Sequence, residues 1–236
     1  TVTAGLRRGS HKFGITINQI LCGIAWRPDW ALSTVEMADK YRNYYPCAVV
    51  GVDIAAGEEY FDREQFPEMY QSHYDMCQRA KDLGISITLH AGETPTGNSL
   101  DNVRRAINDY GATRIGHGYR MVESVELMQE VKAKGVHIEV CPTSSVETGG
   151  WIYDTKNWKE HPACSFLKYG LSFSFNSDDP AVFHTSLSWQ YRLGLAKMEF
   201  TREQVRFWCV SLLIRRFLLT DTHYLSFTLC SFFRQT

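Results

Sequence analysis

The sequence predicts an α/β fold built on a parallel sheet, because short β-prone runs alternate with segments of helical periodicity. Six strand–helix pairs of this kind follow one another along the chain. Polar side chains gather where the predicted strands end, and that end is where (β/α) barrels and open parallel sheets bind their ligands. With 236 residues, 44% of them hydrophobic, the chain can bury the substantial core that such a fold requires.

The predicted strands are runs rich in β-branched and aromatic residues, each bounded by glycine or polar residues. The first lies within residues 13–23, where Ile15 and Ile17 alternate with polar or small residues. The other five cover residues 48–54, 85–89, 113–115, 137–141 and 171–176.

Helix signals separate these strands. Ser33 is placed to cap a helix that runs through Tyr44, and Pro67 suits the first position of the next helix, which Gly84 ends. Ser124 is the expected cap of a helix over residues 125–134. Further helical patterns cover residues 100–110 and 163–169, and Thr201 with Gln204 forms a capping box.

Composition excludes several classes of partner. The 25 basic and 26 acidic residues leave a formal charge of -1, so the chain lacks the cationic surface that tracks a phosphate backbone, and we expect no nucleic-acid partner. No apolar run approaches the ~18 residues that span a bilayer, so no membrane association is expected. Seven cysteines occur without a C-x-x-C pair, which favours reduced thiols and a cytoplasmic location.

Histidines and carboxylates at the strand ends form the strongest chemical signal. His90 and Asp178 are donors that zinc accepts, while Glu93 and His117 offer acid–base groups beside them. Each has a structural alternative: a lone histidine is often only a hydrogen-bonded residue, and Asp178 to Pro180 also fits a turn or helix cap. Three strand ends carrying His, His and Asp together favour a metal-assisted site. No glycine-rich phosphate loop accompanies them.

Four segments resemble, in their order, the motifs of the adenosine deaminase family, and the likeness extends from about Phe13 through Thr201. The segments are His90-Ala91-Gly92-Glu93, Arg114 to Tyr119, Glu139 to Ser145 and Ser174 to Pro180. The unrelated cytidine-type zinc deaminases instead use H-x-E with P-C-x-x-C, which this sequence lacks.

The resemblance implies a (β/α)8 TIM-type barrel with one catalytic Zn²⁺. The implied reaction is hydrolysis of adenosine and 2'-deoxyadenosine to inosine and 2'-deoxyinosine, with release of ammonia, by a zinc-activated hydroxide. Carried over by position, His90 and Asp178 would be zinc ligands. Glu93 would protonate the purine ring beside the attacked carbon, and His117 would hold the hydroxide as base or electrostatic stabiliser.

Two further residues would contact the purine by the same resemblance. Asp179 would hydrogen-bond its imidazole edge. Where the family reads Asp-x-Ala-Gly, this chain has Asp53-Ile54-Ala55-Ala56-Gly57, so the backbone amide of Ala56 is the expected second contact. The acidic residues that follow, Glu58 and Glu59, are interpreted as a solvated face.

The sequence departs from the family at both ends. The family's His-x-His strand, which supplies two more zinc ligands, has no match here, and His11 is interpreted as a loop residue. The strands present correspond to the third through eighth units, so we expect an incomplete barrel over residues 1–222, truncated at its N-terminus. Residues 223–236 form a divergent tail, for which a frame-shifted or alternatively spliced end is preferred over a membrane or partner-binding segment.

Three functional hypotheses follow. The first is a zinc-dependent adenosine deaminase acting on a small purine nucleoside. The second is another purine deaminase of the same superfamily, acting on adenine or N6-methyl-AMP. The third is a catalytically inactive truncated isoform that serves as a weak purine binder or an interaction domain, for which the missing His-x-His motif is the best support. The sequence indicates no particular protein partner.

Overall fold

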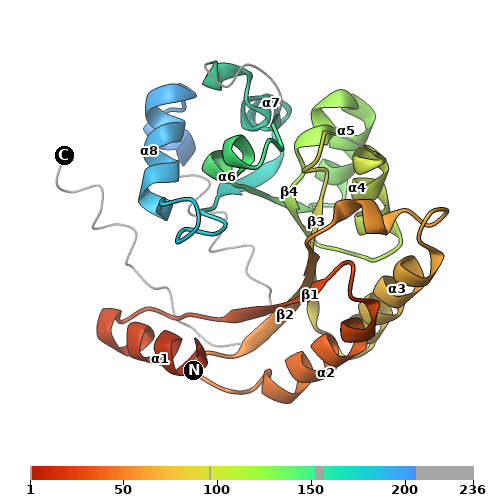
Figure 1. The fold of residues 1–236 in the computed structure, drawn as a ribbon. Helices are drawn as coiled ribbons and strands as arrows, with labels where there is room; N and C mark the ends of the chain where they lie inside the picture. Colours follow the sequence, from red (N-terminus) through yellow and green to blue (C-terminus); the bar gives the residue numbers. More distant parts are fainter. Residues whose placement is uncertain (1, 96, 152–156, 206–236) are drawn as a thin grey trace.

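The computed structural model describes residues 2–95, 97–151 and 157–205, arranged as a parallel sheet with helices around it (Figure 1). Six strands form one sheet in the order of the sequence, and every neighbouring pair is parallel. The strands are Gln19–Ile24 (β1), Val49–Ala55 (β2), Ser86–Ala91 (β3), Arg114–His117 (β4), His137–Val140 (β5) and Ser172–Phe175 (β6). This order confirms the predicted α/β fold and is that of successive strands in a (β/α) barrel.

Helices connect the strands, and α2, α3, α4 and α5 lie along the outer side of the sheet (Figure 1). The α-helices are Val2–Phe13 (α1), Ala31–Tyr41 (α2), Pro67–Asp82 (α3), Ser99–Asn108 (α4), Val125–Ala133 (α5), Pro142–Glu147 (α6), Pro162–Tyr169 (α7) and Leu187–Lys197 (α8). Short 3-10 turns are Pro28–Trp30 (η1), Glu58–Phe61 (η2), Tyr119–Glu123 (η3) and Trp158–Glu160 (η4).

Three of the predicted helix starts are confirmed. The side chain of Ser124 accepts a hydrogen bond from the Leu127 amide at the start of α5, and Pro67 occupies the first turn of α3. Thr201 and Gln204 exchange the two hydrogen bonds of a capping box. The predicted cap at Ser33 is wrong, because η1 already begins the turn and Ser33 lies inside α2, where its hydroxyl donates to the Trp30 carbonyl.

The N-terminal segment differs from its prediction. Residues up to Phe13 form α1, so β1 starts only at Gln19, and His11 is an exposed helical residue rather than a loop residue. The alternation at Ile15 and Ile17 does not mark a strand, because the Ile17 side chain packs back against α1 beside Gly9.

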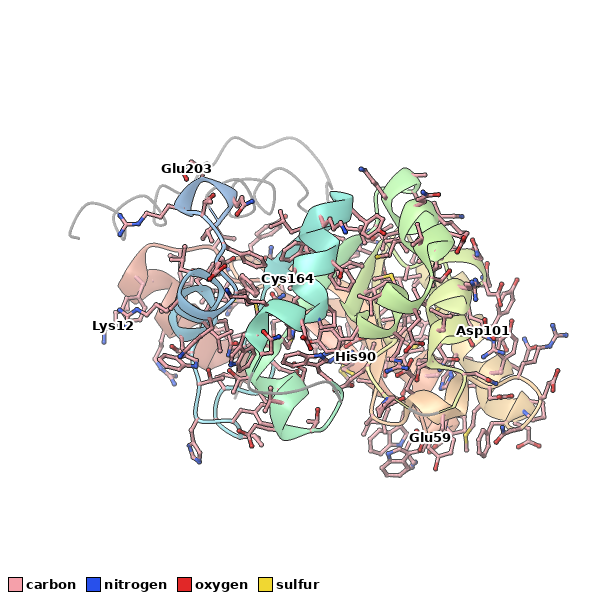
Figure 2. All side chains as sticks on the ribbon, turned by 90° about the horizontal axis from the view of Figure 1, so that it is seen from above. Lys12, Glu59, His90, Asp101, Cys164 and Glu203 are labelled. Atoms are coloured by element: carbon pink, nitrogen blue, oxygen red, sulfur yellow. The ribbon has the colours of Figure 1, made fainter. Side chains whose placement is uncertain are left out.

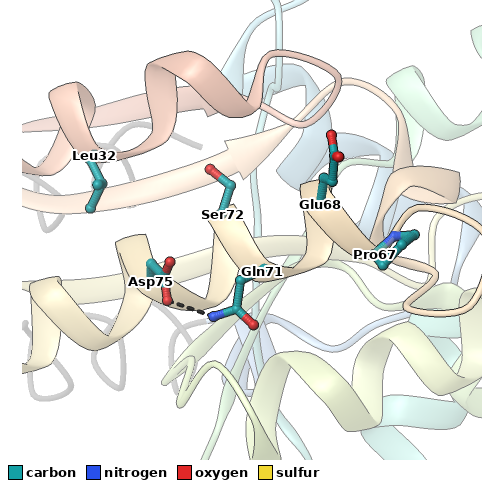
Figure 3. A pocket seen from close by; sticks show the side chains of 6 residues that line it. All are labelled: Leu32, Pro67, Glu68, Gln71, Ser72 and Asp75. Carbon is teal, nitrogen blue, oxygen red and sulfur yellow. Dashed lines mark hydrogen bonds between the residues drawn. The ribbon is translucent and has the colours of Figure 1, made fainter.

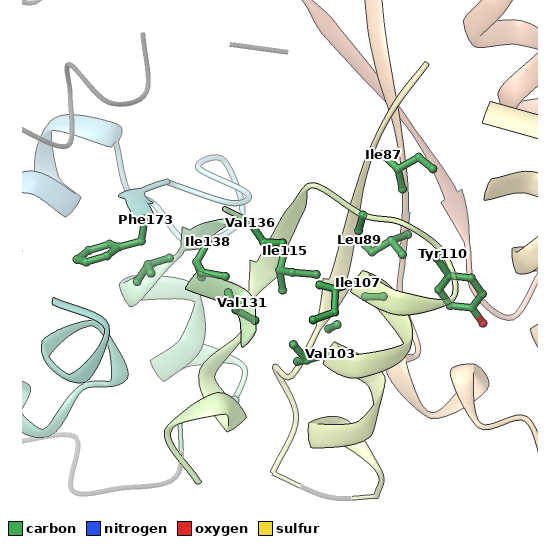
Figure 4. Packing of buried hydrophobic residues seen from close by; sticks show 14 of the residues in the cluster. Ile87, Leu89, Val103, Ile107, Tyr110, Ile115, Val131, Val136, Ile138 and Phe173 are labelled. Carbon is green, nitrogen blue, oxygen red and sulfur yellow. The ribbon is translucent and has the colours of Figure 1, made fainter. Parts of the chain in front are cut away.

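The core lies between the sheet and its outer helices (Figure 4). Strand residues Leu89, Ile115 and Ile138 are buried against helix residues Val103 and Val131 within one hydrophobic cluster. Full burial of such a side chain stabilises a fold by about 1.5–3 kcal/mol. This packing fixes the strands and therefore the side chains at their carboxyl ends.

Some predictions fall beyond the described part of the chain. The boundary at residue 222 and the tail over residues 223–236 lie outside it. Within it, no helix combines the length and apolar character that crossing a membrane requires. The five cysteines in that part are free thiols.

Candidate metal and catalytic site

Strand pairing brings the two candidate histidines together. In the β3–β4 register, His90 faces Gly116 and Ala91 faces His117, and the imidazole centroids of the two histidines lie 5.1 Å apart. A side chain at Gly116 would place its Cβ 3.3 Å from Cγ of His90, so glycine leaves room for that imidazole. Figure 2, seen from above, shows His90 near the middle of the molecule.

Asp178 completes the cluster from the loop after β6. One donor atom from each of His90, His117 and Asp178 lies within 4.8 Å of the others, which is the convergence predicted from the strand ends. Asp178 has φ 53° and His117 has φ 68°, and Ala56 after β2 has φ 61°. Non-glycine residues rarely adopt this left-handed region, and such strain gathers at functional sites.

Asp53 orients His90. Its buried carboxylate accepts a hydrogen bond from Nδ1 of His90 at Oδ1, with 3.2 Å between the two atoms, and Oδ2 lies 3.0 Å from the same nitrogen. This contact leaves Nε2 of His90 as the ring nitrogen available to a ligand, as in carboxylate–histidine–metal arrangements. The sequence placed Asp53 at a strand end but did not reveal this role, which depends on β2 and β3 being neighbours in the sheet.

The charges of the cluster favour a cation. Burial opposes a charge on His90, but Asp53, Glu93 and Asp178 outweigh it and raise the pKa of His90 to about 10. Surroundings that stabilise a protonated imidazole to this extent also attract a metal ion. Because zinc takes imidazole and carboxylate ligands, and three protein ligands are usual in catalytic sites, His90, His117 and Asp178 fit it.

His117 has the opposite environment. Its burial and the neighbouring His90 lower the pKa of His117 to about 4, so its imidazole is neutral near pH 7. Its Nε2 lies 3.6 Å from Oε2 of Glu93 and 3.8 Å from Oδ2 of Asp178. Its Nδ1 is buried with no hydrogen-bond partner among the described residues. A neutral imidazole facing the cluster can accept a proton or bind a metal ion.

Glu93 lies on the loop after β3, where burial raises the pKa of its carboxyl group. His90 opposes this shift, Asp178 adds to it, and the hydroxyl of Thr148, which donates to Oε1 over 3.4 Å, opposes it weakly. The carboxyl group therefore keeps its proton more readily than an exposed glutamate does. This is the property that a general acid requires.

Glu58 is not the solvated residue that the sequence suggested. It is 6% exposed, and its carboxylate accepts hydrogen bonds from backbone amides of the loop that carries Glu93. Glu59 is exposed, as expected. The two acidic residues share the turn η2, and no sequence pattern separates the buried one from the exposed one.

The two predicted purine contacts lie at the same end of the sheet. Ala56 and Asp179 are both exposed. The carbonyl of Asp179 accepts hydrogen bonds from the amides of Val182 and Phe183, so this segment is also the turn that the structural alternative described. Their contact with a purine stays a prediction.

Two surface hollows lie among the described residues, and neither is lined by the converging side chains. A groove between α2 and α3 contains none of the converging side chains (Figure 3). A second hollow of about 540 Å³ lies between α6 and the chain that continues from Asp179 to α8. It is lined by Thr143, Phe183, His184, Thr185, Ser186 and Trp189. Its volume is in the range of small-molecule sites.

Comparison with known proteins decides the family. The family model described as adenosine deaminase matches residues 1–212. The chain belongs to the adenosine deaminase family. It is 34% identical to the adenosine deaminase of Bos taurus and 36% identical to that of Xenopus tropicalis, each over 205 residues. These alignments cover 87% of this chain and 53% of each relative. The Clostridium acetobutylicum adenosine deaminase is 34% identical over 203 residues, 85% of this chain and 55% of its own length. The chain thus spans about half the length of these relatives.

Solved structures of other proteins share the fold. A Burkholderia ambifaria amidohydrolase with bound zinc has a TM-score of 0.78 at 24% identity, covering 92% of this chain and 56% of that chain. An adenine deaminase from Arthrobacter aurescens has a TM-score of 0.75 at 22% identity, over 92% and 62% of the two chains. The N6-methyl-AMP deaminase from Arabidopsis thaliana has a TM-score of 0.67 at 24% identity, over 85% and 54%. These similarities confirm the fold, with the described strands forming part of the barrel.

Proposed function

We propose that this protein catalyses the hydrolytic deamination of adenosine and 2'-deoxyadenosine to inosine and 2'-deoxyinosine with release of ammonia. The observation that carries the proposal is the convergence of His90, Glu93, His117 and Asp178 at the strand ends of a chain in the adenosine deaminase family. Eight relatives that are 31–36% identical are named adenosine deaminases, which favours the nucleoside as substrate.

Zinc is the proposed cofactor. His90 and Asp178 would hold it, and His117 beside them would hold and orient the metal-bound water. Asp53 would keep Nε2 of His90 directed at the metal. When bound, zinc supplies a water molecule whose pKa falls from ~15.7 to ~7, which provides a nucleophile at neutral pH.

The protein's own side chains would move the protons. His117, neutral because of its lowered pKa, accepts a proton from the attacking water. Glu93 donates its proton to the ring nitrogen beside the carbon that carries the amino group, which makes that carbon more electrophilic. A C–O bond forms at this carbon, its C–N bond breaks, and the amino group leaves as ammonia with the proton that His117 took from the water. The remaining hydroxyl proton returns to Glu93 as the product takes its carbonyl form.

The purine would be oriented by two contacts. The Asp179 carboxylate would accept a hydrogen bond from the imidazole edge of the base, and the Ala56 amide would donate one to the ring. Both residues lie just after the ends of their strands, on the side of the sheet that carries His90 and His117.

Glu93→Gln tests the proposed proton donor. We expect turnover to fall by about 10²–10⁴-fold, because the amide cannot replace the acid, while bound zinc is retained. Asp178→Ala should instead lose the zinc itself. The measurements are metal content after dialysis against zinc and the ultraviolet change as adenosine becomes inosine. Glu59→Gln, at an exposed neighbouring position, is the control. Full activity in Glu93→Gln would remove its assignment as proton donor.

Another purine deaminase activity is the second candidate, since structures of adenine and N6-methyl-AMP deaminases share this fold. A substrate panel of adenosine, 2'-deoxyadenosine, adenine and N6-methyl-AMP separates the candidates by their kcat/KM values. A folded protein that binds no zinc and turns over none of the four would instead support the catalytically inactive isoform. The free thiols of the described cysteines support the proposed cytoplasmic location, which cell fractionation tests.

A further inference from the structure

Glu58 links the loop after β2 to the loop after β3. Its Oε1 accepts a hydrogen bond from the Gly92 amide. Its Oε2 accepts hydrogen bonds from the amides of Glu93 and Thr94, and the distance from nitrogen to oxygen is 3.0 Å in both. The Thr94 hydroxyl also donates to Oε2, over 3.2 Å. Three consecutive amides and one hydroxyl of the Glu93 loop are thus directed at a single carboxylate.

The carboxylate is itself held in place from the other side. Asn102 on α4 donates through Nδ2 to the Glu58 carbonyl over 2.9 Å and to its Oε1 over 3.4 Å. Both residues are buried, at 6% and 4% exposure. Hydrogen bonds to a charged group are stronger than those between neutral groups, so this arrangement fixes the loop more firmly than neutral contacts would.

The backbone of the loop requires such support. Gly92 has φ 73°, and a Cβ there would lie 2.7 Å from Cγ2 of Val103 and 3.3 Å from the backbone of Gly118. The chain between His90 and Glu93 is therefore pressed against α4 and the loop after β4 in a conformation that other residues avoid. The Glu58 carboxylate accepts hydrogen bonds from the three consecutive amides of this stretch, those of Gly92, Glu93 and Thr94.

We propose that Glu58 is a positioning residue that sets the location of the Glu93 carboxyl group relative to His117 and the substrate. The inference rests on the proposed deaminase function, in which Glu93 is the proton donor. Glu58 acts through the backbone of the Glu93 loop and does not itself touch the substrate. Since a misplacement of about 1 Å can lower a rate by ~10²-fold, loss of this link should reduce catalysis strongly without removing a reacting group.

Glu58→Gln is the main test, with Glu59→Gln on the same turn as the matched control. Glu58→Gln keeps the size of the side chain but loses its charge and replaces one accepting oxygen with an amide group that donates. We expect kcat for adenosine to fall by about 10²-fold while KM changes little, because the substrate contacts of Asp179 and Ala56 are untouched. A variant that was merely less stable would lose active protein and keep the kcat of its folded fraction.

Amide hydrogen exchange gives a readout that needs neither substrate nor zinc. We expect exchange at Gly92, Glu93 and Thr94 to become about 10–100-fold faster in Glu58→Gln, and to stay at the wild-type rate in Glu59→Gln. If the wild-type chain shows no turnover, the proposed function fails while this measurement still tests the link. Exchange and kcat in Glu58→Gln equal to those of Glu59→Gln would overturn the inference.

A milder variant covers the case in which Glu58→Gln does not fold. Thr94→Val removes the hydroxyl that donates to Oε2 of Glu58 and also hydrogen-bonds with Oγ of Ser99, and it keeps the backbone contacts. We expect faster exchange confined to the Glu93 loop and a drop in kcat of about tenfold, since one charge-assisted hydrogen bond is lost. Unchanged exchange and kcat in this variant would also contradict the proposal.

Discussion

Histidines occur in two kinds of surroundings in this protein, at the strand ends and inside the core. His90 faces three carboxylates, which outweigh its burial and raise its pKa to about 10. His73 and His161 lie in the core, where burial lowers their pKa values to about 4 and about 3. The carboxylates around His90 therefore decide the direction of its pKa shift. His117, whose pKa burial also lowers to about 4, is assigned to the site by its position 3.6 Å from Glu93 and 3.8 Å from Asp178.

The core histidines have structural contacts that account for their positions. His73 on α3 donates from Nε2 to the Ala25 carbonyl over 2.9 Å, at the end of β1. His161 caps α7 by accepting a hydrogen bond from the Ala163 amide, and its ring packs edge-on against Trp151. Neither contact includes a carboxylate, so both rings are neutral near pH 7.

The largest expected effect in the core is a loss of stability in acid. The pKa of His73 is about 4 in the folded protein and near 6.5 in the unfolded chain. Below pH 6.5 the unfolded chain therefore binds a proton that the folded protein does not, and stability falls as the pH decreases towards 4. This group alone should lower the free energy of unfolding by about 3 kcal/mol across that window. Urea unfolding at a series of pH values measures it.

His73→Gln is the variant that isolates this effect. Its side-chain amide can still donate to the Ala25 carbonyl, but it does not titrate, so the variant should lose less stability than wild type between pH 6.5 and pH 4. If the variant and wild type decline in parallel, the ring of His73 is not the group responsible.

At the strand ends, the largest expected effect is on metal affinity rather than stability. Asp53→Asn keeps the size of the side chain but removes the carboxylate that holds Nδ1 of His90. Loss of such an outer partner typically costs 10–100-fold in metal affinity, and we expect zinc affinity to fall by about that factor. Competition with a chromophoric chelator measures this affinity.

Asp75→Asn, at an exposed position of α3, serves as its control and should bind zinc as wild type does. Equal zinc affinity in Asp53→Asn and Asp75→Asn would show that Asp53 does not support His90 as a ligand. A drop in thermal stability of Asp53→Asn without a change in zinc affinity would place Asp53 with the structural residues of the core.

The sequence predicted what depends on local signals. Strand ends, Pro67 and Ser124 are recognisable from periodicity and capping chemistry, and the order of the motifs is enough to group His90, His117 and Asp178 in one site. Contacts between separate loops were not predictable in the same way. Asp53 and Glu58 act on residues more than thirty positions away, and only the parallel pairing of β2 with β3 makes these contacts possible.

Short helices were also difficult to predict. The segment between the fifth strand and residue 163, for which no helix was predicted, contains α6, which has only six residues. The helix α8 was not predicted either, although the Ser186 side chain accepts a hydrogen bond from the Trp189 amide at its start. Its burial is confined to Gln190, Leu193 and Gly194, which is too sparse a pattern to indicate a helix face.

The smallest predicted effect provides a reference outside both histidine environments. Ser124→Ala removes the side-chain oxygen that accepts the Leu127 amide at the start of α5, so this amide loses its cap. Loss of an N-cap costs about 1 kcal/mol, and the loss should be the same at pH 7 and pH 5 because no titratable group is removed. Zinc affinity should be unchanged. Urea unfolding at the two pH values measures the cost, with Ser124→Thr, which keeps a capping hydroxyl, as the matched control. A cost that changes between the two pH values would mean that the Ser124 hydroxyl also acts through the Glu126 carboxylate, to which it donates, and is not a neutral reference.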